Sequence, residues 1–327
     1  MTRAAWVLWA ALPLAAQPKL LVNAQVDTRS ASAGLEGAVR TLQSSQPQPA
    51  WIGWSVPSSR QFNMGCDFVR DGAGINGVVH LEPPTSLIVL ARVEAGQIMR
   101  VRTVSPNCEI DAGGVTLHWL NDVQPAQSVA FLVSLTTDRE RMGDGALSAL
   151  AMHGDPSADA VLERMLAPDQ PASLRQRIVS WEGSYRGKRG VEILRKTIAG
   201  DPDDRVRERA VSALGSSREP EAIDLLLSIA RTGADAKMRS QAVGALNRRD
   251  DKRMLETLTY VVENDKDPGV RRRAVSALQS LPDGAGIPVL IQVARRGDPE
   301  IRKQAMSSLG SSRDPRATAF FEEILKK

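Results

Sequence analysis

The stretch Asp203-Asp-Arg-Val-Arg-Glu-Arg-Ala-Val-Ser-Ala-Leu-Gly215 decides the fold of the C-terminal part of this chain. Its apolar residues fall at offsets of zero, four, five and eight, which places them on one stripe of an α-helix. These residues are Val206, Ala210, Val211 and Leu214. Related stretches run from Asp267 to Leu278 and from Asp298 to Gly310. A helix with one apolar stripe must bury it against neighbours, so the recurrence predicts stacked copies.

Copies of this pattern follow one another with a period of 31 or 32 residues. They begin at Met142, Leu174, Val206, Met238, Val270 and Ile301. A second apolar stripe follows in every copy, marked by Leu162, Leu194, Leu226, Leu258, Leu290 and Phe321. Each copy is therefore predicted to be a hairpin of two helices, and a period of this size is typical of a solenoid. We expect an all-α, armadillo-like superhelix of six repeats over residues 142–327.

Turn residues support the same division of the chain. Asp-Pro dipeptides begin at Asp155, Asp201, Asp267, Asp298 and Asp314, and each supplies an N-cap carboxylate followed by a first-turn proline. Between the two helices of a repeat, Gly183, Gly215, Asn247 and Gly310 come just after the leucine position. We expect left-handed C-terminal caps at these four residues.

The repeats resemble HEAT repeats through the pattern Asp-x-x-Val-Arg-x-x-Ala-Val-x-Ala-Leu-Gly, which is clearest from Asp203 to Gly215. In particular, they are similar to the short HEAT-like repeats that also occur in phycobilisome lyases. The resemblance covers over half of the chain and implies that the helix beginning Val-Arg lines a concave surface. It also implies two enzymatic options, a tetrapyrrole-handling lyase and an iron hydroxylase. The HEAT-repeat iron hydroxylases carry His-Glu pairs, and this sequence has none.

Aspartate and arginine recur together at the start of the first helix of each repeat. The aspartates are Asp203, Asp235, Asp267 and Asp298, and the arginines are Arg207, Arg239, Arg271 and Arg302, with Arg175 in the second repeat. Each carboxylate precedes its helix and each guanidinium lies one turn inside it. We interpret them as a structural ladder that caps the helices and ties neighbouring repeats together.

A functional alternative concerns the remaining arginines, Arg177, Arg209, Arg272 and Arg273, which form a cationic strip on the predicted concave face. Such a strip would bind an acidic partner. Nucleic acid is disfavoured, because acidic residues alternate with the arginines and no aromatic residue lies among them to stack on bases.

The second repeat departs from the pattern, because Glu182 occupies the leucine offset and Trp181 precedes it. Two interpretations follow. Either the helix is rotated and buries Trp181, or the carboxylate of Glu182 faces the groove.

Residues 1–16 have the form of a secretory signal peptide. Arg3 precedes the apolar run from Ala4 to Ala16, which is too short to span a membrane. We therefore expect a bacterial protein that is periplasmic or secreted, with no membrane-spanning helix. An overall composition of 42% hydrophobic and 24% charged residues argues against disorder, and the formal charge of +4 is only mildly basic.

Residues 25–138 show no repeat and predict a small β-rich domain, which makes the whole chain an α+β protein of two modules. We expect an opening helix over Ser32–Leu42 and several short strands rich in Val, Ile, Leu and Trp. The strands are expected at Trp51–Trp54, Gly77–Leu81, Ser86–Val93, Gln97–Val104, Val115–Trp119 and Val129–Thr136, with a hairpin turn at Glu94-Ala-Gly96. Cys66 and Cys108 are the only cysteines, and in an exported protein they favour a disulfide over two buried thiols.

A search for catalytic or ligand-binding motifs gives no convincing site. The three histidines, His80, His118 and His153, are not spaced with other metal ligands, and the glycines of Gly72–Gly77 precede a predicted strand instead of a nucleotide-binding helix. A thiolate and base made by a cysteine and His118 is a remote alternative. We therefore expect no catalytic residue, no cofactor and no metal.

The sequence favours a non-enzymatic scaffold that binds a protein partner through the concave surface of the solenoid. The partner itself is not indicated. A second hypothesis is a binder of a cell-envelope polymer or small ligand, with Trp51, Trp54 and Trp119 as a platform on the β-rich domain, although these residues also suit its core. At the C-terminal edge, Phe320, Phe321 and Leu325 suggest a homodimer contact.

Overall fold

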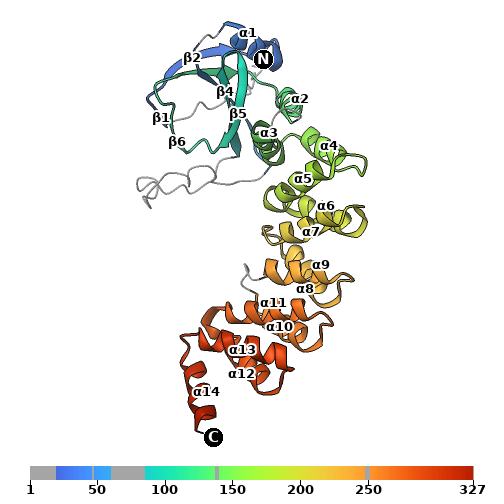
Figure 1. Cartoon of the computed structure of the whole chain (residues 1–327). Helices are drawn as coiled ribbons and strands as arrows, with labels where there is room; N and C mark the ends of the chain where they lie inside the picture. The colour runs from blue at the N-terminus through green and yellow to red at the C-terminus, as the bar shows by residue number, and fades with distance from the viewer. Residues whose placement is uncertain (1–19, 46–47, 60–84, 137–139, 247–250, 327) are drawn as a thin grey trace, which may run out of the picture. The chain divides into compact units, whose positions relative to one another are not determined.

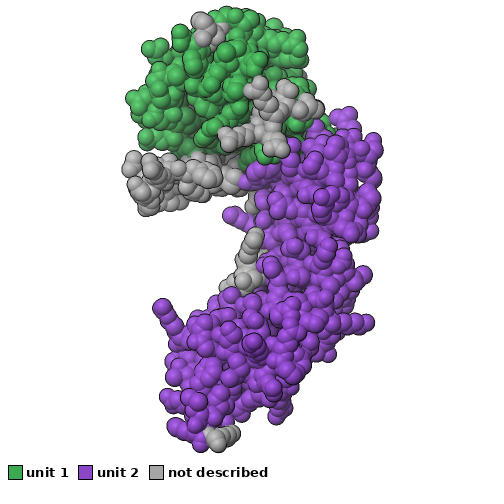
Figure 2. All heavy atoms as spheres, in the orientation of Figure 1, with its two compact units in different colours: residues 1–162 green, residues 163–327 purple. Residues whose placement is uncertain are grey.

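The computed structural model describes residues 20–45, 48–59, 85–136, 140–246 and 251–326 (Figure 1). By packing, the chain divides into two compact units, residues 1–162 and 163–327 (Figure 2). The boundary expected from the repeats, between residues 138 and 142, stays a prediction. None of the helices in the described ranges has the length and apolar character needed to cross a bilayer.

The first unit is built on a mixed five-stranded sheet. Its strands are β2 (Gln25–Ser30), β7 (Thr116–Asn121), β3 (Ala50–Pro57), β4 (Ser86–Glu94) and β5 (Gln97–Val104), in that spatial order. Strand β7 lies between β2 and β3 and is parallel to both, whereas β3, β4 and β5 pair antiparallel. A separate parallel pair joins β1 (Leu20–Val22) to β6 (Glu109–Asp111).

Two helices follow strands of this sheet and bury their apolar sides. Helix α1 (Leu35–Ser45) connects β2 to β3 and buries Leu35, Val39 and Leu42. Helix α2 (Pro125–Leu135) follows β7, so the strand expected over Val129–Thr136 is wrong. A short apolar run does not by itself distinguish a buried strand from a buried helix, because both can be apolar throughout. Here the run packs against the sheet, where Trp54 donates to Ser128 Oγ at 3.0 Å.

The hairpin turn between β4 and β5 and the packing of helix α3 both agree with the local sequence. At the turn between β4 and β5, Ala95 and Gly96 have φ of 48° and 71°, as a two-residue hairpin requires. Helix α3 (Glu140–Met152) packs on β5 at Gly145, where any side chain would overlap the backbone carbonyl of Val101. The expected strand at Gly77–Leu81 lies outside the described residues, as do residues 1–16.

Twelve helices, α3 to α14, occupy the described part of the region predicted to form six helical hairpins, which confirms that fold. The first helices of the hairpins are α3, α5 (Ala172–Tyr185), α7 (Asp204–Leu214), α9 (Ala236–Leu246), α11 (Pro268–Gln279) and α13 (Pro299–Gly310). The second helices are α4 (Pro156–Met165), α6 (Gly187–Gly200), α8 (Pro220–Thr232), α10 (Arg253–Asn264), α12 (Ile287–Arg296) and α14 (Pro315–Leu325). A 3₁₀ turn, η1 (Pro282–Gly284), precedes α12.

The offsets predicted for the first helices are the buried ones. Val206, Ala210, Val211 and Leu214 are fully buried, as are their counterparts in α9 and α11 at the alanine, valine and leucine positions. They belong to one apolar core that continues from Val179 to Phe320 through the second unit. Alanine at the fourth offset keeps successive first helices close together, because it adds little volume between them.

The glycines after the leucine position do not form left-handed caps, so that expectation is wrong. Gly215 has φ −62°, and Gly183 lies inside α5. Their role is close approach between repeats: a side chain at Gly183 would overlap the carbonyl of Ala213, and one at Gly215 would crowd Ala245. Asn247 lies outside the described residues. The N-caps hold as predicted at Asp267, Asp298 and Asp314, whose carboxylates accept backbone N–H groups ahead of a first-turn proline. The N-cap expected at Asp201 is wrong, because Asp203 caps α7 and Asp201 ends α6.

Candidate functional site: the groove of the first helices

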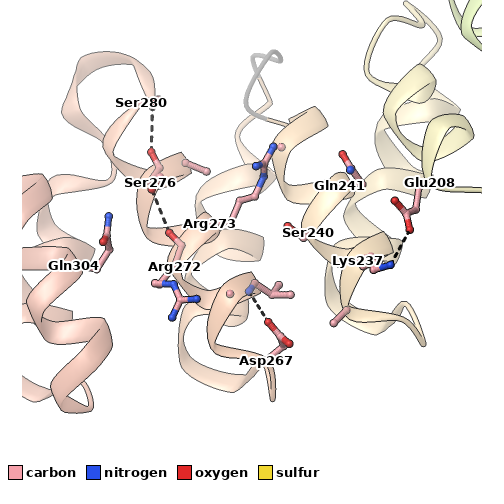
Figure 3. Close-up of a pocket in the computed structure, with 15 residues that line it drawn as sticks. Glu208, Lys237, Ser240, Gln241, Asp267, Arg272, Arg273, Ser276, Ser280 and Gln304 are labelled. Carbon is pink, nitrogen blue, oxygen red and sulfur yellow. Dashed lines mark hydrogen bonds and ion pairs between the residues drawn. The ribbon is translucent and has the colours of Figure 1, made fainter. Parts of the chain in front are cut away.

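The first helices of the second unit bury one side in the core and turn the other side to an open groove. Two adjoining hollows make up this surface, which we call the first-helix groove. The larger, of about 750 Å³, is lined by α7, α9, α11 and α13 (Figure 3). The smaller, of about 590 Å³, is lined by α5, α7 and α9, and shares Glu208 and Gln241 with the larger. The groove therefore runs across successive repeats.

Two rows of side chains follow the groove, one residue per repeat in each row. At the third offset the row is Arg177, Arg209, Gln241, Arg273 and Gln304, and at the sixth it is Ser180, Ser212, Gly244, Ser276 and Ser307. The long residue of one repeat reaches the small residue of the repeat before it. Arg209 Nε donates to Ser180 Oγ at 2.7 Å, and Ser212 Oγ donates to Gln241 Oε1 at 3.2 Å. These bonds link neighbouring first helices on the groove side.

Between α9 and α11 the small residue is Gly244, and the kind of hydrogen bond that links α5 to α7 and α7 to α9 is missing. Arg273 extends from α11 toward α9, and a Cβ at Gly244 would overlap its guanidinium (Figure 3). The backbone of α9 offers no hydroxyl here. Within the described chain no hydrogen bond or ion pair to the Arg273 side chain forms. This exposed guanidinium therefore differs from that of Arg209, which bonds to serine.

The electrostatics of the groove favour anions. Its described lining contains six cations and two carboxylates. The cations are Arg177, Arg205, Arg209, Lys237, Arg272 and Arg273, and the acids are Glu208 and Asp267. Both carboxylates already have partners: Glu208 lies 3.9 Å from Lys237, and Asp267 accepts the backbone N–H of Val270 at 3.0 Å. The lining thus carries positive charge in excess, although three of its cations, Arg205, Lys237 and Arg272, are themselves paired with Asp203, Glu208 and Glu300.

On the other side of the first helices, buried ion pairs hold some repeats together. Arg175 donates to Asp201 through Nε at 2.8 Å and Nη2 at 3.0 Å, and both side chains are under 5% exposed. Arg239 makes the same fork to Asp265 at 2.7 and 2.8 Å. The hydrogen bond to Asp201 raises the pKa of Arg175 above its ordinary value. These pairs join residues 26 positions apart.

The alternate repeats lack this pair, because Gly233 and Gly297 occupy the positions equivalent to Asp201 and Asp265. Arg207 instead bonds to the backbone carbonyl of Asp201 at 2.6 Å and to the carboxylate of Asp204. Arg271 donates to Asp298 Oδ2 at 2.6 Å, and Asp298 is the residue after Gly297. Both guanidiniums are more exposed than Arg175 and Arg239.

With this geometry the repeats can be compared with known proteins. A family model described as HEAT repeats matches residues 166–247 and 255–327. The C-terminal half of this chain belongs to the HEAT-repeat superfamily. No curated protein matches the chain. The solved structure of human deoxyhypusine hydroxylase in complex with glycerol is similar over 60% of this chain and 77% of that one, with 18% identity and a TM-score of 0.33. That similarity carries no conclusion about function.

In the HEAT repeats, the aspartates and arginines of the predicted ladder have separate roles: the aspartates cap helices, and some of the arginines form ion pairs with other aspartates. The four aspartates cap the first helices: the carboxylates of Asp203, Asp235, Asp267 and Asp298 accept backbone N–H groups two or three residues later. The arginine of the same repeat is not their ion-pair partner. Asp203 pairs with Arg205, and Asp298 with Arg271 of the repeat before. The ties of Arg175 and Arg239 involve Asp201 and Asp265, which the sequence reading did not assign to the ladder. Arg302 is exposed.

The four arginines predicted to bind a partner all line the first-helix groove. Arg177 and Arg209 lie in the smaller hollow, and Arg272 and Arg273 in the larger. Arg272 forms an ion pair with Glu300 of the next repeat. The sequence reading missed Gly244, although its departure from serine at the sixth offset is visible in the aligned repeats.

Both interpretations of the second repeat are wrong. Glu182 is fully buried at the leucine offset, so its carboxylate does not face the groove. Trp181 is half-buried and stacks on Tyr185, with 5.6 Å between ring centroids. Helix α5 therefore keeps the orientation of the other first helices and places a carboxylate in the interior.

The tryptophan platform proposed for the β-rich domain is also wrong. Trp54 and Trp119 are fully buried in the first unit, where Trp54 packs edge-on against Phe131. Trp51 is half-buried beneath the guanidinium of Arg92. Since two of the three rings are core residues, they form no exposed stacking surface.

The remaining candidates for chemistry are separate from the groove. His118 is buried and lies 2.9 Å from Asp27, and the hydrogen bond from His118 lowers the pKa of Asp27. His153 is buried and accepts the backbone N–H of Asp155 at 3.1 Å. Among the described residues no cluster of three or more potential metal ligands forms. His80 and Cys66 lie outside them, so the disulfide to the buried Cys108 stays a prediction.

Proposed function

We propose that this protein is an exported, non-enzymatic scaffold that holds a protein partner in the first-helix groove. The observation that carries the proposal is the continuity of the groove over five first helices, each of which contributes polar side chains to it. HEAT repeats stack as a series, so one surface accumulates residues from many repeats. Such a surface suits a long partner better than a small molecule, which binds in an enclosed apolar pocket.

The proposal that the protein is not an enzyme rests on the sequence. The catalytic signatures that would accompany a HEAT fold, such as paired His-Glu ligands, are missing from the whole chain. The proposal of export rests on the pattern of residues 1–16. Mass spectrometry of the protein isolated from cell-envelope fractions tests it, because export predicts a chain that has lost these residues. An intact N-terminus in the cytoplasmic fraction would contradict it.

Site-specific photo-cross-linking tests the scaffold proposal. A photoreactive side chain at Ser240 would sit in the groove, and one at the exposed Gln292 on second helix α12 is the matched control. We expect a discrete adduct with one protein from position 240 in living cells and none from position 292. Equal adducts from both positions, or adducts from neither, would contradict binding in the groove.

We also propose a homodimer contact at the C-terminal edge, in a narrower form than the sequence suggested. Phe320 is buried in the repeat core, whereas Leu325 is 84% exposed and Ile324 is 36% exposed. The exposed apolar surface is therefore the last turn of α14. Replacing both residues with serine should convert a dimer to a monomer in light scattering without lowering the melting temperature. An unchanged mass would remove this contact from the proposal.

A further inference from the structure

We infer that the notch formed by Gly244 and Arg273 binds a carboxylate of an acidic, extended segment of the protein partner. This inference rests on the proposed scaffold function and adds the chemistry of the partner. It begins from the two rows of the groove. Where the small residue is Ser180, its hydroxyl accepts a hydrogen bond from the Arg209 guanidinium at 2.7 Å. Where it is Gly244, the corresponding guanidinium has no such partner in the described chain.

Gly244 makes room for the guanidinium of Arg273, which lies where a side chain at position 244 would begin. With no side chain at position 244, the guanidinium of Arg273 lies against the backbone of α9. Figure 3 shows it between Gln241 and Ser240 on one helix and Ser276 on the other. A carboxylate that approaches from solvent can accept two parallel N–H bonds from one guanidinium, which is the strongest common geometry for this pair. Amide and hydroxyl groups nearby can bond to the adjoining peptide backbone.

The surrounding charges favour an acidic occupant. Arg272 and Lys237 line the same hollow and pair with Glu300 and Glu208, and Asp267 is engaged by the N-terminus of α11. An entering carboxylate can therefore bind Arg273 without displacing an acid from it. Clusters of this kind attract opposite charge before contact forms.

The spacing of the repeats matches an extended polypeptide. Packed helices lie roughly 8–10 Å apart, and an extended chain in the polyproline II conformation rises about 3.1 Å per residue with three residues per turn, so every third side chain points to the same side. Acidic residues at every third position would thus meet successive repeats. A nucleic acid fits less well, because the described lining has no aromatic side chain for base stacking and includes two carboxylates.

Two variants separate charge from space. Arg273→Gln removes the guanidinium, whereas Gly244→Ser keeps every charge, displaces the guanidinium from the α9 backbone and supplies a hydroxyl like that of Ser180, to which Arg209 donates. Its Cβ meets only the flexible end of Arg273, and serine is a better helix former than glycine, so folding should be retained. The control is Arg296→Gln, which removes the same charge from an exposed position on α12, a second helix.

Fluorescence anisotropy with the full-length protein provides the test. The probes are a labelled peptide of about twelve residues, long enough for several repeats, with Glu at every third position, and its counterpart with Gln in place of Glu. We expect the Glu peptide to bind about tenfold more tightly, and both groove variants to weaken it about tenfold while Arg296→Gln does not. Circular dichroism confirms that the variants are folded.

Each other outcome overturns the inference in a distinguishable way. If both peptides bind equally and Gly244→Ser weakens both, the groove binds polypeptide without a preference for acids, and the scaffold proposal survives alone. If all three variants weaken the Glu peptide equally, or if neither peptide binds, the notch is not a carboxylate site. Tighter binding of a labelled single-stranded oligonucleotide, lost in Arg273→Gln, would assign the notch to phosphate instead.

Discussion

The junctions between repeats fall into two kinds that alternate along the second unit. Arg175 and Arg239 each donate two hydrogen bonds to a buried aspartate that follows the second helix of the same repeat and leads into the next one. Arg207 and Arg271 begin their helices in the same way but face Gly233 and Gly297, and they bond to nearer or more exposed groups. This difference shows that an arginine at the start of the first helix is not sufficient to form a buried ion pair at the junction. The residue just after the second helix decides whether the tie is buried.

The largest effect is expected when a buried junction loses its counter-charge. Asp201→Asn keeps the shape and the acceptor for the N–H of Asp203, but it leaves the 3%-exposed Arg175 without an opposite charge. Breaking a buried pair from one side costs several kcal/mol, so we expect a loss of about 3 kcal/mol. Urea unfolding followed by circular dichroism measures it.

The control is Asp298→Asn at an exposed junction. Asparagine still caps α13, and the pair with Arg271 is partly solvated, so the loss should stay below about 1 kcal/mol. Equal losses in the two variants would break the distinction between the two kinds of junction.

The pH dependence of the other buried junction should be smaller but directional. Burial by itself raises the pKa of Asp265, but the hydrogen bonds from Arg239 and from the N–H of Asp267 outweigh it, and the pKa lies below its ordinary value of 3.8. A lowered pKa in the folded state means that Asp265 stabilises the protein fully above 3.8 and loses this effect as pH falls through the folded value.

Asp265→Asn should therefore be less stable than the unsubstituted protein by a constant amount above that pH. The gap should narrow in more acidic solution. Urea titrations at a series of pH values measure the gap, and a gap that widens on acidification would contradict this sign.

The smallest effect is expected when an exposed junction is converted to the buried kind. Gly233 has φ −56° and ψ 133°, close to the values of Asp201 and Asp265. Gly233→Asp should place a carboxylate within reach of Arg207, and losing a glycine also restricts the unfolded chain. Against this, the new Cβ approaches the carbonyl of Ile229 at 2.7 Å, which requires a small backbone shift.

We expect a net gain of up to about 1 kcal/mol for Gly233→Asp, seen as a higher melting temperature. Gly233→Ala is the control, because it carries the same Cβ without the carboxylate. If aspartate is no more stable than alanine, then the position of Arg207, and not glycine, sets the difference between the junctions.

Much of the fold could be predicted from the sequence, because the evidence for it is local. Apolar residues recur at the offsets of Val206, Ala210, Val211 and Leu214 in every repeat except at Glu182 of the second, and a helix places such residues on one side whatever surrounds it. The N-caps at Asp267, Asp298 and Asp314 depend on backbone groups two or three residues away. The arginines of the groove were also predictable, since their offset differs from that of the core residues.

The errors came where a residue's role depends on a distant neighbour. Val129–Thr136 is apolar enough for a strand or a helix, and only its packing on the sheet selects α2. Gly183 and Gly215 are placed for close approach to the next repeat, not for a turn. Glu182 occupies a core offset where the pattern has leucine. Trp54 is buried against α2, and Trp119 is buried among Ile88, Leu90 and Leu117 of the sheet.

By itself, the sequence determined that residues 142–327 form helical hairpins of the HEAT type, because periodicity within one helix is enough to define an apolar stripe. Only the tertiary structure decided which aspartate each arginine binds and that the guanidinium of Arg273 faces the groove without a hydrogen-bond acceptor in the described chain. The partners of Arg175 and Arg239 lie 26 residues away, and the neighbour of Arg273 is the glycine of another repeat. Such contacts depend on how helices stack, since a side chain can bond only to what packing brings within its reach.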